Sequence, residues 1–189
     1  MLLDLKETGT IAVIGQGYVG LPLALSFAMN GQNVIGVDSN PEIRKNLASG
    51  RTLQNENWNG KSIETILKEQ LESGRYRLSG NTVAAVREAE TICLTVGIPV
   101  ADGQPLLDSF HGACEQIGKG LQAGSLVLIR STVIPGTSES YCVPLFEKLS
   151  GLKFGETLFV AYVPERIAEG SAFEEFRTIS YAVSLGKTK

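Results

Sequence analysis

Short apolar runs alternate with longer amphipathic segments along most of the chain. The runs have the length of strands, and most of their positions are apolar, which is typical of strands covered on both faces of a sheet. Each run therefore predicts one buried strand. The predicted strands are residues 11–14, 34–37, 91–96, 125–130, 158–162 and 179–185.

The segments between these runs predict helices. Asn30 and Gly31 end the first one, because glycine adopts the left-handed backbone that follows a helix. Asn40 is a suitable N-cap for the second, which begins at Pro41. Residues 50–60 are polar and predict a loop. The predicted helices are residues 19–29, 41–48, 63–71, 83–89, 106–121 and 137–149.

The alternation of strands and helices predicts an α/β fold of the Rossmann-like, doubly wound kind, with a mainly parallel sheet and helices on both faces. The 189 residues suffice for one ample domain. We expect a short tail over residues 1–9 and one domain over residues 10–189. Because the last predicted strand runs almost to the final residue, we interpret this domain as the N-terminal part of a longer enzyme.

Residues 15–20 (GQGYVG) join the first predicted strand to the first predicted helix. Gly15 permits a tight turn, Gly17 leaves room for a pyrophosphate, and Gly20 lets the helix pack closely on the strand. The backbone N–H groups of this turn, with Tyr18 and Val19, then face the phosphates together with the positive end of the helix dipole. The turn predicts a dinucleotide site.

Asp38 ends the second predicted strand. A carboxylate there accepts hydrogen bonds from the adenosine ribose and repels a 2′-phosphate, which favours NAD over NADP. Two alternatives stay open. The turn could be a glycine-rich structural feature beside a surface aspartate, and FAD uses the same kind of turn.

Two further groups follow predicted strands, at the edge where open α/β sheets bind ligands. Gly97, Ile98 and Pro99 follow one strand, and Ser131 and Thr132 follow the next. The two hydroxyl groups are candidates for hydrogen bonds to a cofactor or substrate. The alternative is purely structural: residues 135–137 (PGT) end the strand and cap the next helix through Thr137.

Residues 163–170 (VPERIAEG) follow a third strand and contain two glutamates and an arginine. A glutamate held near a cofactor can act as a general base when burial raises its pKa. A solvated charged turn is the alternative, and the spacing alone favours it.

Three of these segments resemble the N-terminal half of the UDP-glucose/GDP-mannose dehydrogenase family. They are GQGYVG at 15–20, STVxPGT at 131–137 and PERIAEG at 164–170, in matching order and separation. The Pro-Glu-Arg form, in place of Pro-Glu-Phe, resembles the branch that oxidises UDP-N-acetyl-hexosamines, notably UDP-N-acetyl-mannosamine.

The resemblance implies a reaction and a set of partners. A sugar C6 alcohol is oxidised to a carboxylate in two hydride transfers to two NAD molecules. A cysteine captures the aldehyde, and the resulting thioester is hydrolysed, which divides a difficult step in two. The resemblance also implies a nucleotide-sugar substrate and an intact parent that is a homodimer or larger.

The resemblance further assigns roles to individual residues. Glu165 matches the acid/base of the hydrolysis, and Thr132 matches the threonine that positions water. Glu169 matches a residue near the nicotinamide. The remaining implied cofactor contacts are Gly15, Gly17, Tyr18, Val19, Gly20, Asp38, Gly97, Ile98, Pro99 and Ser131. The implied substrate contacts are Arg166, Ile167, Ala168, Glu169 and Gly170.

The chain departs from the family pattern at three places. The family's G-x-C-x-P-K-like cysteine motif is absent, and we interpret all three cysteines as small core residues. Ile43 stands where a basic residue is common, with Arg44 one position later. Residues 54–59 (QNENWN) replace a common Tyr-Glu-Pro-Gly stretch.

Composition narrows the remaining classes of protein. A net charge of −3 gives no electrostatic case for nucleic acid or an anionic membrane, and no apolar run is long enough for a membrane span. The start is too short and too acidic for a signal peptide, so we expect a cytoplasmic protein. The cysteine spacing and the single histidine predict no metal site.

Three functions remain. We favour the NAD-binding domain of a nucleotide-sugar 6-dehydrogenase that acts on a UDP-N-acetyl-hexosamine, with UDP-glucose or GDP-mannose as alternative substrates. A hydroxyacid dehydrogenase would share the phosphate turn but has no need of residues 164–170. A non-catalytic NAD-binding module would bind the cofactor without depending on a nucleotide sugar.

Overall fold

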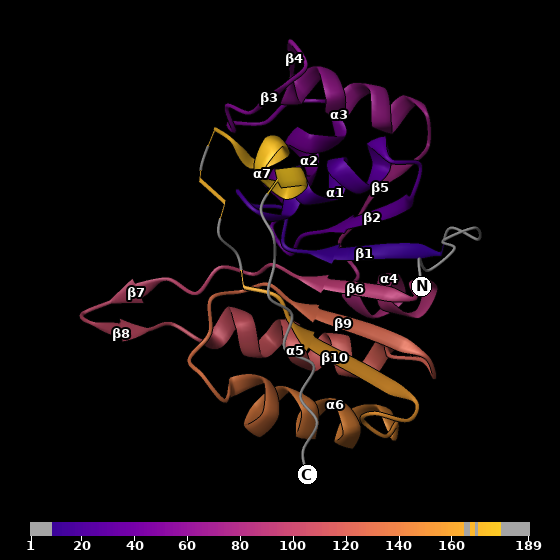
Figure 1. Cartoon of the computed structure of the whole chain (residues 1–189), viewed down its shortest axis with the longest axis vertical. Coiled ribbons are helices and arrows are strands. Elements are labelled where there is room, and N and C mark those ends of the chain that lie inside the picture. Colours follow the sequence, from indigo (N-terminus) through magenta and orange to yellow (C-terminus); the bar gives the residue numbers. More distant parts are fainter. Residues whose placement is uncertain (1–8, 165–166, 169, 179–189) are drawn as a thin grey trace.

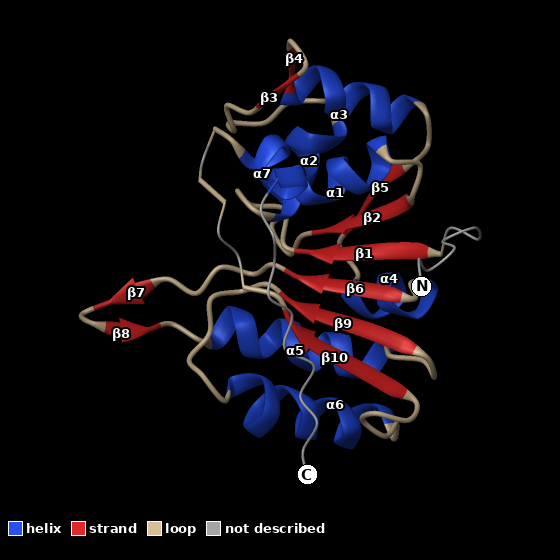
Figure 2. Cartoon of the chain, viewed as in Figure 1, coloured by secondary structure: helices blue, strands red, loops and turns tan. Residues whose placement is uncertain are grey.

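A six-stranded sheet forms the centre of the molecule in the computed structural model, which describes residues 9–164, 167–168 and 170–178. All its strand pairs are parallel, in the order β10-β9-β6-β1-β2-β5. The arrows of β1, β6 and β9 in Figure 2 point to the same, carboxyl edge of the sheet. The strands are β1 (Thr10–Ile14), β2 (Asn33–Val37), β5 (Tyr76–Ser79), β6 (Thr91–Leu94), β9 (Ser125–Ile129) and β10 (Leu158–Tyr162).

Helices cover both faces of this sheet, as the alternation predicted (Figure 1). One face carries α4 (Thr82–Glu88), α5 (Asp108–Gly120), the π-helical turn η1 (Ser138–Cys142) and α6 (Val143–Ser150). The other face carries α1 (Gly20–Met29), α2 (Pro41–Ala48), α3 (Ile63–Glu72) and α7 (Ala172–Thr178). The doubly wound fold class is therefore confirmed.

Two apolar clusters hold these layers together. Neighbouring strand residues point to opposite faces, so Ala12 and Ile14 enter the cluster under α5, whereas Val13 enters the cluster under α1. Phe110 and Phe146 fill the first cluster, and both are fully buried. Among the described residues, no helix is long and apolar enough to cross a membrane.

The predicted helix ends agree in part with the structure. The N-cap at Asn40 is confirmed, because its side chain accepts a hydrogen bond from the backbone N–H of Glu42 at 2.9 Å. Thr137 makes no side-chain cap; its hydroxyl instead donates to the carbonyl of Ile134 at 2.7 Å. The alternative of a side-chain cap from Thr137 is therefore wrong, because the backbone of Thr137 is already helical and its hydroxyl points back to Ile134.

The structure adds elements that the pattern did not predict. Residues 50–60 contain β3 (Asn57–Trp58), which pairs with β4 (Lys61–Ser62), so the loop prediction is wrong at this hairpin. A second hairpin, β7 (Val100–Ala101) and β8 (Gln104–Pro105), follows β6. The edge strand β5 and helix α7 were also missed. The predicted strand at 179–185 lies outside the described residues.

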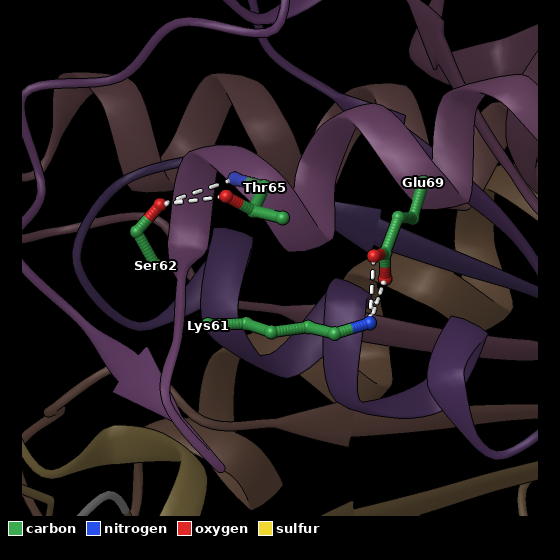
Figure 3. Close-up of polar contacts among 4 residues, drawn as sticks. All are labelled: Lys61, Ser62, Thr65 and Glu69. Carbon is green, nitrogen blue, oxygen red and sulfur yellow. Dashed lines mark hydrogen bonds and ion pairs between the residues drawn. The ribbon is translucent and has the colours of Figure 1, made fainter.

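The β3–β4 hairpin leads directly into α3 and fixes where that helix begins (Figure 3). The Ser62 side chain accepts the backbone N–H of Thr65 at 3.3 Å and lies 3.0 Å from its hydroxyl. The Lys61 ammonium bridges both carboxylate oxygens of Glu69, at 2.6 and 2.9 Å, with both side chains about half exposed. The cap therefore acts on the first turn of α3, and the ion pair ties Lys61 to the second.

The two contacts should differ in their effect on stability. Ser62→Ala removes a helix cap and should lower the free energy of unfolding by ~1 kcal/mol. Glu69→Gln breaks a solvated ion pair and should cost less than ~0.5 kcal/mol. Urea unfolding of both variants checks this expectation. A larger loss for Glu69→Gln than for Ser62→Ala would show that the ion pair, and not the cap, holds the helix start.

Candidate cofactor site

A crevice lies at the carboxyl edge of the sheet between β1 and β6. The chain leaves β1 for α1 on one face and leaves β6 for α5 on the other, so the connections diverge at this point. Parallel α/β sheets bind ligands at such a divergence. The cavity there measures 570 Å³. Its lining includes Gly15, Gly17, Asp38, Gly97 and Pro99, five of the residues predicted to bind the cofactor.

The three glycines of the turn differ in what surrounds them. Gly15 has a φ of +97°, a backbone conformation that side chains disfavour. A Cβ on Gly20 would lie 1.7 Å from the Gly15 carbonyl oxygen, so α1 can begin there only with glycine. A Cβ on Gly17 would meet no atom within 4 Å. Gly17 therefore keeps open a space that the fold itself does not fill, and this fits a bound pyrophosphate.

Asp38 is held in place by backbone donors at the end of β2. Its Oδ2 accepts the N–H of Gln16, and its Oδ1 accepts the N–H of Asn40, both at 2.9 Å. A carboxylate has about four lone-pair sites, so each oxygen can still accept a ribose hydroxyl. Arg44 lies behind this turn, where its guanidinium donates to the carbonyl oxygens of Asp38 and Ser39 at 2.7 and 2.9 Å.

A buried side-chain brace, which sequence reasoning missed, supports the turn from below. The Tyr76 hydroxyl donates to Gln16 Oε1 at 2.7 Å, and Gln16 Nε2 donates to the Val13 carbonyl at 2.8 Å. Gly36 makes room for the phenol, since a Cβ there would lie 2.4 Å from the hydroxyl oxygen. Burial, with a smaller contribution from the Asp38 charge, raises the pKa of Tyr76. The phenol therefore remains a hydrogen-bond donor.

The residues after β9 occupy different places. The Ser131 hydroxyl donates to the Val96 carbonyl at 2.7 Å and is buried, so it ties the end of β9 to that of β6. Thr132 lines a separate cavity of 210 Å³ with Ile98 and His111. The His111 ring lies against Tyr141 with centroids 4.4 Å apart, and this histidine is half-buried.

Tyr18, Val19 and Gly20 lie at the start of α1. Tyr18 is 56% exposed and lines a third cavity, of 490 Å³, beside α2 and the loop that follows it. Val19 precedes the first helical residue, and its backbone is already helical. The structure thus brings Gly15, Gly17, Asp38, Gly97 and Pro99 to one crevice, whereas Tyr18 lines a different cavity.

The third predicted segment begins at the same edge of the sheet, where β10 ends. Pro164 follows β10, and Gly170 precedes α7, which packs against α1 on the other half of the sheet. Ile167 is half-buried, whereas Ala168 and Gly170 are exposed. The predicted site residues Glu165, Arg166 and Glu169 lie outside the described residues.

All three cysteines are core residues, as predicted. Cys93, Cys114 and Cys142 have no exposed surface. Burial raises the pKa of Cys93 to about 12. The pKa of Cys114 is raised by a hydrogen bond with Cys142 and by burial. None of these thiols is therefore suited to act as a nucleophile. Within the described ranges, no group of three or more His, Cys, Asp or Glu side chains could hold a metal ion.

The strand order, the glycine turn and the acid after β2 define a dinucleotide-binding domain of the Rossmann class. Within that class, the chain belongs to the UDP-glucose/GDP-mannose dehydrogenase family, since the model of that family's NAD-binding domain matches residues 9–188. The cofactor of the domain is accordingly NAD.

Similar proteins agree with this assignment. The chain is 36% identical to Protein CapL of Staphylococcus aureus, covering 92% of this chain and 39% of that protein. It is 35% identical to a UDP-N-acetyl-D-glucosamine 6-dehydrogenase of Pseudomonas aeruginosa, covering 96% and 40%. The chain thus spans about two fifths of the length of these relatives.

Solved structures show the same fold. The UDP-D-ManNAc dehydrogenase of Pyrococcus horikoshii superposes with a TM-score of 0.84 at 33% identity, over 92% of this chain and 40% of that one. The GDP-mannose dehydrogenase of Pseudomonas aeruginosa, solved as a ternary complex, gives a TM-score of 0.80 at 29% identity, over 88% and 38%.

Two alanine substitutions should separate the space for the cofactor from the packing of the turn. Gly17→Ala meets no atom, so it should leave the melting temperature nearly unchanged and weaken NAD binding by about tenfold or more, ~1.4 kcal/mol. Gly20→Ala collides with the Gly15 carbonyl and should destabilise the fold itself. Calorimetric titration with NAD and thermal unfolding check both. Full NAD affinity in Gly17→Ala would show that the pyrophosphate lies elsewhere.

Proposed function

We propose that this chain is the cofactor-binding part of a nucleotide-sugar 6-dehydrogenase that oxidises the C6 alcohol of a UDP-N-acetyl-hexosamine, UDP-N-acetyl-mannosamine or a close relative, to the carboxylate. The observation that carries the proposal is the open glycine turn at the carboxyl edge of the sheet, the same edge at which β10 ends and the 164–170 segment begins. The relatives named for UDP-N-acetyl-D-glucosamine and UDP-N-acetyl-D-mannosamine support the substrate class.

In this proposal each predicted site residue contacts a different part of NAD or of the reacting groups. The open space at Gly17 and the spare lone pairs of Asp38 hold the diphosphate and adenosine ribose of NAD. When bound, NAD supplies the hydride acceptor. The wall of the site towards the nicotinamide is formed by Gly97, Ile98, Pro99 and Ser131, and Glu169 lies near the nicotinamide. Thr132 positions the water molecule for the hydrolysis. Tyr18, Val19 and Gly20 present the first turn of α1 to the phosphates.

The substrate side of the proposal depends on the segment after β10. Arg166, Ile167, Ala168, Glu169 and Gly170 run along the nucleotide sugar, and Glu165 acts as acid and base. The captured aldehyde needs a thiol from outside the described core, since Cys93, Cys114 and Cys142 are buried. We therefore place the nucleophile in another part of the complete enzyme, which we propose to be a homodimer or larger.

The preference for NAD should depend on the charge of Asp38. Asp38→Asn removes the repulsion of a 2′-phosphate, so the ratio of the NADP to the NAD dissociation constant should fall about tenfold, ~1.4 kcal/mol. Fluorescence titration with both reduced cofactors measures this ratio. Asp102→Asn, in the β7–β8 turn, removes the same charge away from the crevice and should leave the ratio unchanged. Equal ratios in both variants would remove Asp38 from cofactor selection.

The role of Glu165 is tested in the complete enzyme that carries this domain. Glu165→Gln should lower turnover of a UDP-N-acetyl-hexosamine about a hundredfold or more and leave a covalent sugar adduct, visible by intact mass spectrometry, because hydrolysis loses its base. Glu156→Gln, in the exposed loop before β10, is the matched control. Unchanged turnover would exclude Glu165 from the mechanism. The 189-residue chain by itself should bind NAD and produce no NADH from any UDP-sugar.

A further inference from the structure

Glu56 is a buried acid that does not line the cofactor crevice, and only 2% of its surface is exposed. Its two carboxylate oxygens accept two backbone donors: Oε1 takes the N–H of Gly170 at 2.5 Å, and Oε2 takes the N–H of Ala172 at 2.9 Å. These donors lie 114 and 116 residues later in the chain. Hydrogen bonds to an ionised acceptor are about twice as strong as neutral ones.

Glu56 belongs to a segment, residues 52–58, that touches both sides of the site; we call it the bridging segment. At one end, Gln54 Nε2 donates to the carbonyl oxygen of Gly17, in the cofactor turn, at 3.0 Å. At the other end, Glu56 holds Gly170 and Ala172, and β3 contacts α7. The bridging segment therefore joins the cofactor turn to the segment that follows β10.

Other contacts hold helix α7 and the stretch of chain that leads into it. Ala172 and Phe173 are buried in the cluster under α1. Phe176 lies under the Arg130 guanidinium, 5.4 Å from the ring centroid. The Glu175 side chain accepts the N–H of Ala168 at 2.5 Å. Helix α7 is thus seated firmly, and the stretch leading into it is held by two acids, one local and one from the bridging segment.

We propose that Glu56 is a positioning residue for the nucleotide sugar. Its carboxylate fixes the backbone at Gly170 and Ala172, and this sets where the backbone that leads into α7 meets the substrate. Glu56 itself touches neither substrate nor cofactor. The inference rests on the proposed function for its substrate side, while the anchoring of the backbone is independent of that function.

The position of Gly170 explains why such an anchor is needed. Gly170 is exposed and has a φ of +91°. Because glycine has no side chain to restrict φ and ψ, the residue itself does not fix this backbone conformation. Ordering such a residue costs conformational entropy. Two charge-assisted hydrogen bonds to a buried acceptor offset this cost before the substrate arrives, which preorganises the site.

The first test is hydrogen exchange of the 189-residue chain, without any ligand. Glu56→Gln keeps the shape of the side chain but places an amide NH₂ group against a backbone N–H. Exchange at Gly170 and Ala172 should become about tenfold faster or more. Glu64→Gln is the matched control, because Glu64 accepts the N–H of Thr52, so the substitution removes a carboxylate contact at a different point of the bridging segment. Equal protection in Glu56→Gln and the wild type would overturn the anchoring.

A milder variant guards against a general loss of folding. Glu56→Asp keeps the charge but is one methylene shorter, so it should lie between the wild type and Glu56→Gln. Trp58, the single tryptophan, lies in β3 against α7, and its emission reports whether α7 stays docked. Accelerated exchange confined to Gly170 and Ala172, with unchanged Trp58 emission, supports a local anchor. Loss of protection throughout the core in both variants would contradict it.

The second test uses steady-state kinetics of the complete enzyme. Glu56→Gln should lower kcat/KM for a UDP-N-acetyl-hexosamine about tenfold or more, with a higher KM for the sugar, while the KM for NAD stays within about twofold, because Gln54 still holds Gly17. A merely structural role would lower kcat with both KM values unchanged, and that result would overturn the proposal. If the wild type turns over no UDP-hexosamine, the proposed function fails, and the exchange measurement still decides the anchoring.

Discussion

The close approach of helix α1 to the end of strand β1 is the constraint on which the rest of the site depends. With the first helical residue next to the Gly15 carbonyl, no side chain fits at Gly20. This approach places the helix start at the carboxyl edge of the sheet, and the N-terminus of a helix is suited to bind phosphate. It also leaves Gly17 over open space. The cofactor space is therefore a consequence of how tightly one helix packs on one strand.

The turn is rigid because polar contacts fix it from two sides. The Gln16 side chain reaches down to Tyr76 and the Val13 carbonyl, while its backbone N–H reaches Asp38. The same aspartate that is suited to a ribose is thus part of the frame that shapes the phosphate turn. A substitution in this network acts on several parts of the site at once, since buried hydrogen-bonded groups rarely behave independently.

The cofactor turn and the stretch before α7 are joined by a segment that is not part of the sheet. The bridging segment contacts Gly17 through Gln54 and the stretch before α7 through Glu56. Gln54, which contacts the cofactor turn, and Glu56, which contacts the stretch before α7, are therefore only two positions apart in sequence. Such an arrangement lets the site form as a unit, provided that both contacts are made in the same folded state.

The sequence by itself determined the sheet class, the glycine turn and Asp38, because buried strands, helix caps and tight turns leave local signals in residue type and spacing. It also placed the cysteines in the core. The edge strand β5, the two small hairpins and α7 were missed, since short elements carry too few positions for a period. Only the tertiary structure revealed Tyr76 beneath Gln16 and Glu56 against Gly170. Those pairs are 60 and 114 residues apart, and nothing local in either partner records which distant backbone or side chain the fold will bring to it.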